Sequence, residues 1–307
     1  MKISTQLMFE RGSSQMSSVQ SKVAQTQVQL AQGKQVINAS DAPDQASTIQ
    51  RMKSILSRQE SYQSSLNTVK NRLIGEESAL QSVSDLLVRA KEVAVQGAND
   101  TLSAGDRKAL AIEMKALRDQ MLSLANTQDT NGNFMFAGSR VKQAAFAENS
   151  SGVPIYQGDQ TRMNVRVGEQ RSIPVNRTGT DAFVPVARKD TDGTSVGVGF
   201  FKVMDDLVAG LNNSKGPDIR RGVGELDNLQ LGVSLAQAQI GTNLNVVDQQ
   251  TAVLEDTTLN LKTTLSSIED LDYASAITKM NQQMMSLEAA QASFAKVSQL
   301  NLFNYIK

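Results

Sequence analysis

The sequence predicts a mainly α-helical protein, in which both ends of the chain form a long antiparallel helical rod or coiled-coil bundle and a small β-rich domain is inserted between them. Three observations support this fold class. Apolar residues recur at alternating spacings of three and four near both chain ends, which is the pattern of one helix face. Residues 131–199 instead carry turn signals and short alternating runs. The low aromatic content of 4% and the five prolines suit long amphipathic helices.

The first predicted helix is defined by a stripe of mostly apolar residues that begins at Met16. It should end near Asn38, where the sequence turns to NASDAP. The stripe consists of Met16, Val19, Val23, Thr26, Leu30, Gly33 and Ile37.

A start signal for a second helix follows directly. Asp41 can cap it, Pro43 suits its first turn, and Asp44 favours its positive end. This helix should continue to Gly97, with Gly75 as its weakest point, because an interior glycine costs about 1 kcal/mol relative to alanine.

Three further helical stripes are predicted. Asp106 opens one helix, and a long stripe covers residues 240–268. A long amphipathic rod is not stable alone in water, so each stripe needs partner helices, and the first and last stripes are similar enough in length to pair in antiparallel fashion. The last stripe consists of Tyr273, Ile277, Met280, Met284, Leu287, Phe294 and Leu302.

The middle of the chain is predicted to form short strands. Phe134 and Phe136 alternate with Met135 beside an Asn-Gly turn. Further on, Met163, Val165 and Val167 share one face before a GEQ turn, and Ile173 and Val175 follow it. A short helix is expected over residues 203–211.

These elements predict three parts. Residues 1–40 and 270–307 form a terminal coiled coil, residues 41–130 and 222–269 a helical rod, and residues 131–221 an outer β-rich domain.

The composition argues against an enzyme, a cofactor site and a metal site. The chain has no histidine and no cysteine, which removes the commonest general base and the usual ligands of zinc, haem and iron–sulfur clusters. The formal net charge is +0, and basic residues are scattered without aromatic neighbours, so nucleic-acid binding is not expected. No apolar run is long enough for membrane insertion, and the N-terminus has no conventional signal peptide.

Two short segments could be imagined as ligand sites. The glycine-rich run VGVGF has no strand and helix of a nucleotide fold around it, so a phosphate loop is not expected. The acidic run IEDLD could hold a cation, although a helix junction or a solvated helix face explains it better.

The aromatic residues near the chain ends are the most unusual feature, since termini are normally polar and frayed. A helix pair buries only one seam, so apolar residues outside that seam need cover from other chains. We therefore expect an assembly interface at the two ends, made of Leu7, Phe9, Phe294, Leu302, Phe303 and Tyr305.

Four segments resemble the flagellin superfamily. They are MKISTQLMF, QVINASDAPDQASTIQRM, LANTQDTNGNFMFAGSR and the last 40 residues from IEDLDYASA to LNLFNYIK. Within this superfamily the ending LNLFNYIK and the short middle segment are more similar to the hook-associated proteins of the third type, which join hook to filament, than to flagellin, the filament subunit. Filament formation stays open as the alternative.

The resemblance implies a structural role outside the bacterial cell. It implies export without a cleaved signal peptide through the flagellar type III apparatus, with a cytoplasmic chaperone. It further implies a homo-oligomeric ring of about eleven subunits, in contact with the first-type hook-associated protein and with flagellin. Terminal helices would then build the inner tube, and the β-rich domain would face outward.

Overall fold

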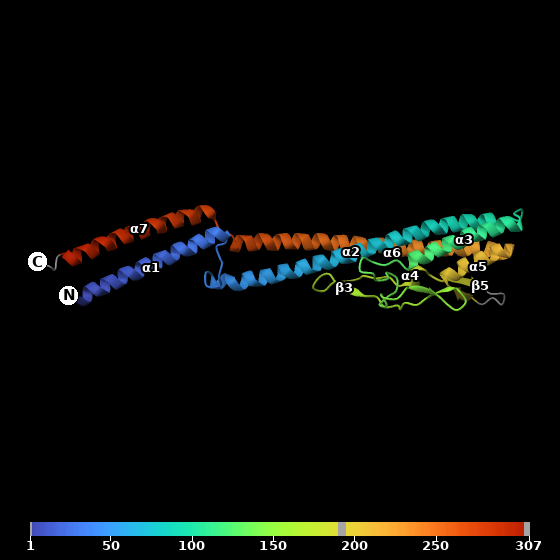
Figure 1. Ribbon diagram of the computed structural model, residues 1–307, viewed down its shortest axis with the longest axis horizontal. Coiled ribbons are helices and arrows are strands. Elements are labelled where there is room, and N and C mark those ends of the chain that lie inside the picture. Colours follow the sequence, from blue (N-terminus) through green and yellow to red (C-terminus); the bar gives the residue numbers. More distant parts are fainter. Residues whose placement is uncertain (1, 190–194, 304–307) are drawn as a thin grey trace. The chain divides into compact units, whose positions relative to one another are not determined.

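The computed structural model of the protein describes residues 2–189 and 195–303 (Figure 1). The predicted fold class, long helices from both chain ends around a small strand-containing insert, is confirmed. In chain order the elements are α1 (Lys2–Gln32), α2 (Pro43–Gly97), α3 (Ala104–Ala125), β1 (Phe146–Glu148), β2 (Pro154–Tyr156), β3 (Asn164–Arg166), β4 (Ser172–Pro174), α4 (Gly179–Ala182), β5 (Val186–Lys189), β6 (Ser195–Val198), α5 (Phe200–Asn212), α6 (Gly216–Glu269) and α7 (Tyr273–Phe303).

The described chain forms two compact units, which we call the terminal unit and the central unit. The terminal unit contains the described residues up to 58 and from 256 onward, and the central unit contains those of 59–255. Helices α2 and α6 each contribute to both. The finer three-part division stays a prediction.

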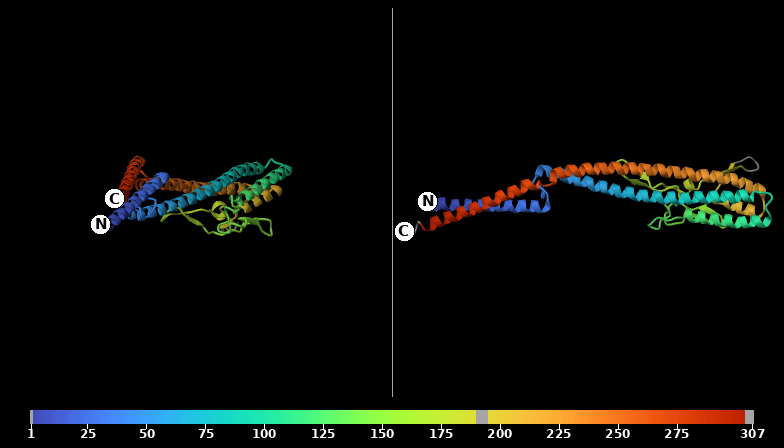
Figure 2. Two further views of the ribbon diagram at one scale, coloured as in Figure 1. Left: turned by 60° about the vertical axis from the view of Figure 1, so that its left-hand side comes forward. Right: turned by 90° about the horizontal axis from the view of Figure 1, so that it is seen from above.

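The terminal unit is built on α1 and α7, which lie side by side and run in opposite directions (Figures 1 and 2). The predicted antiparallel pairing of the chain ends is therefore confirmed. The seam on α1 follows the predicted stripe, with additional half-buried residues toward the N-terminus. These seam positions are Phe9, Gly12, Met16, Val19, Val23, Thr26 and Leu30.

Helix α1 ends earlier than the stripe predicted. It stops at Gln32 because Gly33 adopts a left-handed conformation, with φ of 67°, which glycine reaches without a steric penalty. The prediction that the helix continues to Ile37 is wrong: the Ile37 amide donates to the Asp41 carboxylate at 3.1 Å. Periodicity alone could not separate a glycine on a helix face from a glycine that ends the helix.

The expected capping role of Asp41 is also wrong. Its carboxylate accepts hydrogen bonds from the amides of Ile37 and Asn38, at 3.1 and 2.8 Å, and so closes the turn before α2. Helix α2 nevertheless begins at Pro43 and ends at Gly97, as predicted. Gly75 does not interrupt it: a Cβ there would lie 2.9 Å from the Met135 Cε, so the glycine leaves room for that side chain.

The phase of the α7 seam differs from the prediction. Ile277 and Met284 do not lie on the seam, because they are 46% and 42% exposed. Ala276, which is buried, and the half-buried Gln283 occupy those positions instead. The buried or half-buried positions, spaced alternately by four and three, are Ala276, Met280, Gln283, Leu287, Ala290 and Phe294.

The central unit has a continuous hydrophobic core. Within it α2 and α6 are linked in antiparallel register, since Lys91 binds Asp227 and Lys70 binds Asp248 at 2.8 Å. Helix α3 packs against α5, and its N-terminus is capped by the Ser103 hydroxyl, which accepts from the Asp106 amide. The largest fully buried side chains are Leu66, Leu80, Leu87, Met114, Met121, Phe136, Phe201, Met204, Leu207, Leu211, Ile219 and Leu226.

The insert consists of three separate antiparallel hairpins, β1–β2, β3–β4 and β5–β6. The predicted pairing around the GEQ turn is confirmed, with Val165 opposite Ile173. The predicted alternation of Phe134, Met135 and Phe136 in a strand is wrong, because the segment forms isolated bridges and Met135 and Phe136 are both buried.

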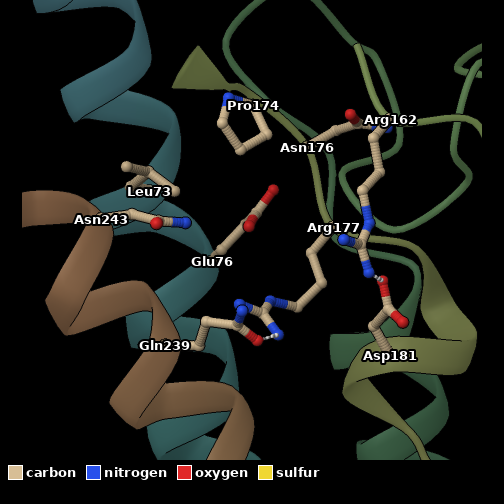
Figure 3. A pocket seen from close by; sticks show the side chains of 9 residues that line it. All are labelled: Leu73, Glu76, Arg162, Pro174, Asn176, Arg177, Asp181, Gln239 and Asn243. Atoms are coloured by element: carbon tan, nitrogen blue, oxygen red, sulfur yellow. Dashed lines mark hydrogen bonds and ion pairs between the residues drawn. The ribbon is translucent and has the colours of Figure 1, made fainter. Parts of the chain in front are cut away.

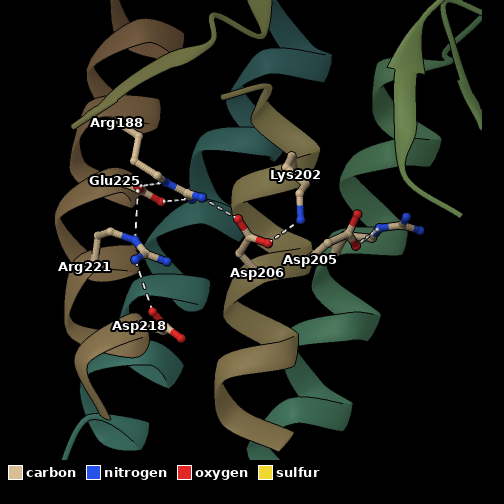
Figure 4. Close-up of polar contacts among 8 residues, drawn as sticks. Arg188, Lys202, Asp205, Asp206, Asp218, Arg221 and Glu225 are labelled. Carbon is tan, nitrogen blue, oxygen red and sulfur yellow. Dashed lines mark hydrogen bonds and ion pairs between the residues drawn. The ribbon is translucent and has the colours of Figure 1, made fainter. Parts of the chain in front are cut away.

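Ion pairs attach the last hairpin to the helices (Figure 4). Arg188 on β5 donates to both carboxylate oxygens of Glu225 on α6, at 2.6 and 2.7 Å, and to Asp206 on α5 at 2.7 Å. Glu225 is buried, so this bidentate contact compensates for its loss of hydration.

Candidate assembly interface

The structure brings two of the predicted interface residues together. The rings of Phe9 on α1 and Phe294 on α7 meet edge to face, with centroids 5.0 Å apart. Gly12 lies beside this pair, since a Cβ there would be 3.2 Å from the Phe294 ring. These aromatics therefore pack within the helix pair rather than pointing only outward.

The other predicted residues are not part of this contact. Leu7 is 47% exposed. Leu302 and Phe303 lie in the last turn of α7, with side chains outside the described residues, and Tyr305 also lies outside them. The six residues stay a prediction as an assembly interface.

The helix pair buries little of its own surface. Among the described side chains of α1 and α7, only Val23, Thr26 and Ala276 are buried, and none of the three is fully buried. The Thr26 hydroxyl lies 3.1 Å from the Gln283 Oε1, so part of this small seam is polar. A pair with so little buried apolar area contributes weakly to its own ordering.

A second apolar face runs along the start of α7, outside the seam. It is formed by Tyr273, Ile277, Met284 and Met285, with exposed fractions between 42% and 62%. We call this the outer face of α7. Sequence reasoning assigned three of these residues to the seam and missed the face as a separate surface. A second helical stripe runs from Ala276 to Ala290, in which Ala276 and Gln283 stand one residue before Ile277 and Met284 of the predicted stripe. This second stripe is the signal that could have shown the face to be separate from the seam.

The connections that join these helices to α2 and α6 bind each other. Glu269, at the end of α6, is buried and pairs with Lys34 and Lys53, each at 2.8 Å. Burial alone would raise the pKa of Glu269, but the hydrogen bonds from the two lysines outweigh it and lower that pKa. The Leu271 amide donates to the Gly33 carbonyl at 3.0 Å.

The acidic run IEDLD is thus a helix junction, as its more ordinary interpretation predicted. Asp272 caps α7, because its carboxylate accepts from the Ala274 amide at 3.0 Å and the Ser275 hydroxyl at 2.7 Å. Within the described ranges no group of acidic residues is arranged to hold a metal ion.

The run VGVGF lies on β6 and the first turn of α5. In the part of the chain that the structure describes, no helix is long and apolar enough to cross a membrane.

Two regions of the chain match the terminal helical regions of a known protein family. Residues 3–141 match the bacterial flagellin N-terminal helical region, and residues 223–306 match the bacterial flagellin C-terminal helical region. The chain belongs to the bacterial flagellin family. The two matched regions contain the paired terminal helices and most of α2 and α6.

Individual relatives of this flagellin-family chain are similarly informative. It is 28% identical to flagellar hook-associated protein 3 of Escherichia coli K12, over 100% of both chains. The crystal structure of Xanthomonas campestris FlgL is similar with a TM-score of 0.62 and 25% identity, over 71% of this chain and 100% of that one. The flagellar junction protein FlgL of Legionella pneumophila shares the fold, with a TM-score of 0.58 at 18% identity, over 66% of this chain and 99% of that one.

Proposed function

We propose that this flagellin-family chain is a structural adaptor at the junction between the hook and the filament of the bacterial flagellum. The observation that carries the proposal is the match to hook-associated protein 3 along the entire length of both chains. The match includes the middle segment, where the fold carries three small hairpins rather than a large outer domain.

In this proposal the subunits form a ring of about eleven copies on which the filament assembles, with the first-type hook-associated protein and flagellin as neighbours. A ring needs heterologous contacts, so each subunit must present two different surfaces. The terminal unit supports this requirement, because one apolar stripe is used in the α1–α7 seam and the outer face of α7 stays uncovered. Leu7, Leu302, Phe303 and Tyr305 would extend the assembly surface toward the chain ends.

The proposed role is structural and not catalytic, and it places the protein outside the cell after export through the type III apparatus with a chaperone. The absence of cysteine agrees with this route, since no disulfide would hold the chain folded during passage.

Deletion of the gene tests the junction role directly. Electron microscopy of the deletion strain should show intact hooks without filaments, flagellin should accumulate in the medium, and a plasmid copy should restore the filaments. Normal filaments in the deletion strain would refute the proposal.

A filament subunit is the alternative, because the matched family regions are those of flagellin. Purified protein added to filament seeds separates the two roles: a junction subunit should cap the seeds or leave them unextended. Growth of long filaments from this chain alone would favour the alternative.

A further inference from the structure

Glu76 is a buried carboxylate without a hydrogen bond. It lies on α2 in the central unit and is 0% exposed (Figure 3). Neither of its carboxylate oxygens has a hydrogen-bond partner among the described residues. The nearest cation on its own helix is Arg72, whose Nε lies 3.4 Å from the Glu76 Oε1. A buried carboxylate in this state is costly, since the ion pair with Arg72 compensates for only part of its lost hydration.

The Glu76 side chain points into a small cavity where three parts of the central unit meet (Figure 3). Helix α2 supplies one wall and α6 a second, and the segment that contains the β3–β4 hairpin closes the third. The lining residues are Leu73, Glu76, Arg162, Pro174, Asn176, Arg177, Asp181, Gln239 and Asn243.

Arg162 of the insert and Arg72 of α2 each have polar partners other than Glu76. Arg162 pairs with Asp181 at 2.9 Å. Arg72 donates to the Met135 carbonyl at 3.0 Å, and its Nη1 lies 3.5 Å from Asp129.

Arg177 is the remaining cation of the cavity. Its Nη1 lies 3.4 Å from the Gln239 Oε1, and its Nε has no hydrogen-bond partner in the described part of the chain. Among the lining residues, α6 contributes only the amides of Gln239 and Asn243. Arginines therefore surround Glu76, and Arg72 forms an ion pair with it, but among the described residues its carboxylate has no hydrogen-bond partner.

We propose that ionisation of Glu76 loosens the packing of residues 161–178 against α2 and α6, so that this part of the insert opens more often above neutral pH. When the segment is closed, the protonated acid is favoured over the carboxylate, because the Glu76 side chain is buried. When the segment opens, water reaches the carboxylate and solvates it.

The direction of the pH dependence follows from the pKa of Glu76. Burial raises this pKa to about 7, and the nearby Arg72 and Arg177 reduce the rise without cancelling it. In the open form the pKa returns toward its ordinary value of 4.5, so opening releases a proton between these two values. The closed form is thus favoured at low pH, and its advantage is lost as the pH rises toward 7. Opening should increase about tenfold between pH 6 and pH 8.

Few other groups could produce such a step. The chain has no histidine. Asp205 on α5 also has a raised pKa, chiefly through burial, but its carboxylate faces Arg118 and does not line this cavity. A substitution at Glu76 therefore distinguishes the effect of its ionisation on the pH dependence from the effect of Asp205.

Amide hydrogen exchange of the full-length protein at pH 6 and pH 8 tests the proposal, with rates corrected for the intrinsic effect of pH. In the wild type, amides of residues 161–178 should lose about tenfold protection at pH 8, while amides of residues 84–96 on α2 should change little. Glu76→Gln should remove this difference. Glu77→Gln, on the same helix with a half-exposed side chain, should retain it.

Wild-type protection of residues 161–178 that does not change with pH would overturn the proposal. So would a pH step that persists in the folded Glu76→Gln protein. If that variant does not fold, the wild-type profile decides, because a merely structural Glu76 would give no local step near pH 7.

Discussion

The central and terminal units use the same kind of amphipathic helix but bury very different shares of it. In the central unit α2, α3, α5 and α6 surround fully buried side chains such as Leu80, Met114, Phe201 and Leu226. In the terminal unit α1 and α7 meet along one narrow, partly polar seam, and apolar residues stay exposed beside it. Burial of apolar area is the main favourable term in folding. The central unit therefore supplies most of the stability of the free chain, and in the proposed function the terminal unit supplies the surface that contacts other subunits.

The largest loss of stability is expected when an aromatic side chain is removed from the core of the central unit. Phe201 is 1% exposed, and its ring lies 5.1 Å from that of Phe146. Phe201→Ala should lower the free energy of unfolding by about 3 to 5 kcal/mol, through lost burial and the cavity left behind. Urea unfolding followed by circular dichroism measures this loss.

Phe294→Ala is the matched control in the terminal unit, where the ring is half-buried against Phe9. Its effect on the main transition should be about 1 kcal/mol or less. Equal losses for the two variants would show that the units do not differ as described.

A smaller effect is expected from the ion pairs that attach the β5–β6 hairpin. Arg188→Met would leave the buried Glu225 with Arg221, at 3.7 Å, as its one remaining ion-pair partner among the described residues. It should cost about 2 to 3 kcal/mol in the free energy of unfolding, again measured in urea. The control is Arg89→Met, which removes an exposed pair with Glu113 and should leave the midpoint within error of the wild type. An Arg188→Met variant with the free energy of unfolding of the wild type would mean that other contacts hold the hairpin.

The smallest effect on stability, and the largest on assembly, is expected at the C-terminal tail. Phe303→Asp and Tyr305→Asp should leave the urea midpoint of the central unit unchanged, because that unit has its own core. Incorporation into flagella, scored by complementation of the deletion strain, should be lost. Gln291→Asp adds a charge at an exposed position of α7 and should retain incorporation. Incorporation of the tail variants would remove these residues from the interface.

The sequence was sufficient to predict elements whose signals are local. Pro43 and Gly97 bound α2 because the first suits a helix start and the second follows the last periodic residues. Val165 pairs with Ile173 because a short turn sets the register of a hairpin. The paired chain ends followed from two stripes of similar length.

What could not be predicted depends on long-range packing. Hydrophobicity ranked Ile277 above Ala276, yet close approach of two helices favours the smaller residue at the seam. The ring cluster of Phe146, Phe183 and Phe201 joins three segments that no local pattern connects. The spacing of apolar residues in α2 places Glu76 on the same stripe as Leu73 and Leu80, but it could not predict that the carboxylate has no hydrogen-bond partner among the described residues.

Lys34 and Lys53 share the carboxylate of Glu269, and this makes the three positions differ in how well they tolerate substitution. Loss of Lys34 or of Lys53 leaves the carboxylate with one cation, which still balances its charge. Loss of Glu269 leaves the ammonium groups of Lys34, in the connection before α2, and of Lys53, on α2, without the carboxylate that they share. Mutational tolerance at these three positions is therefore asymmetric: either lysine can vary while the other remains, whereas loss of the glutamate removes the partner of both.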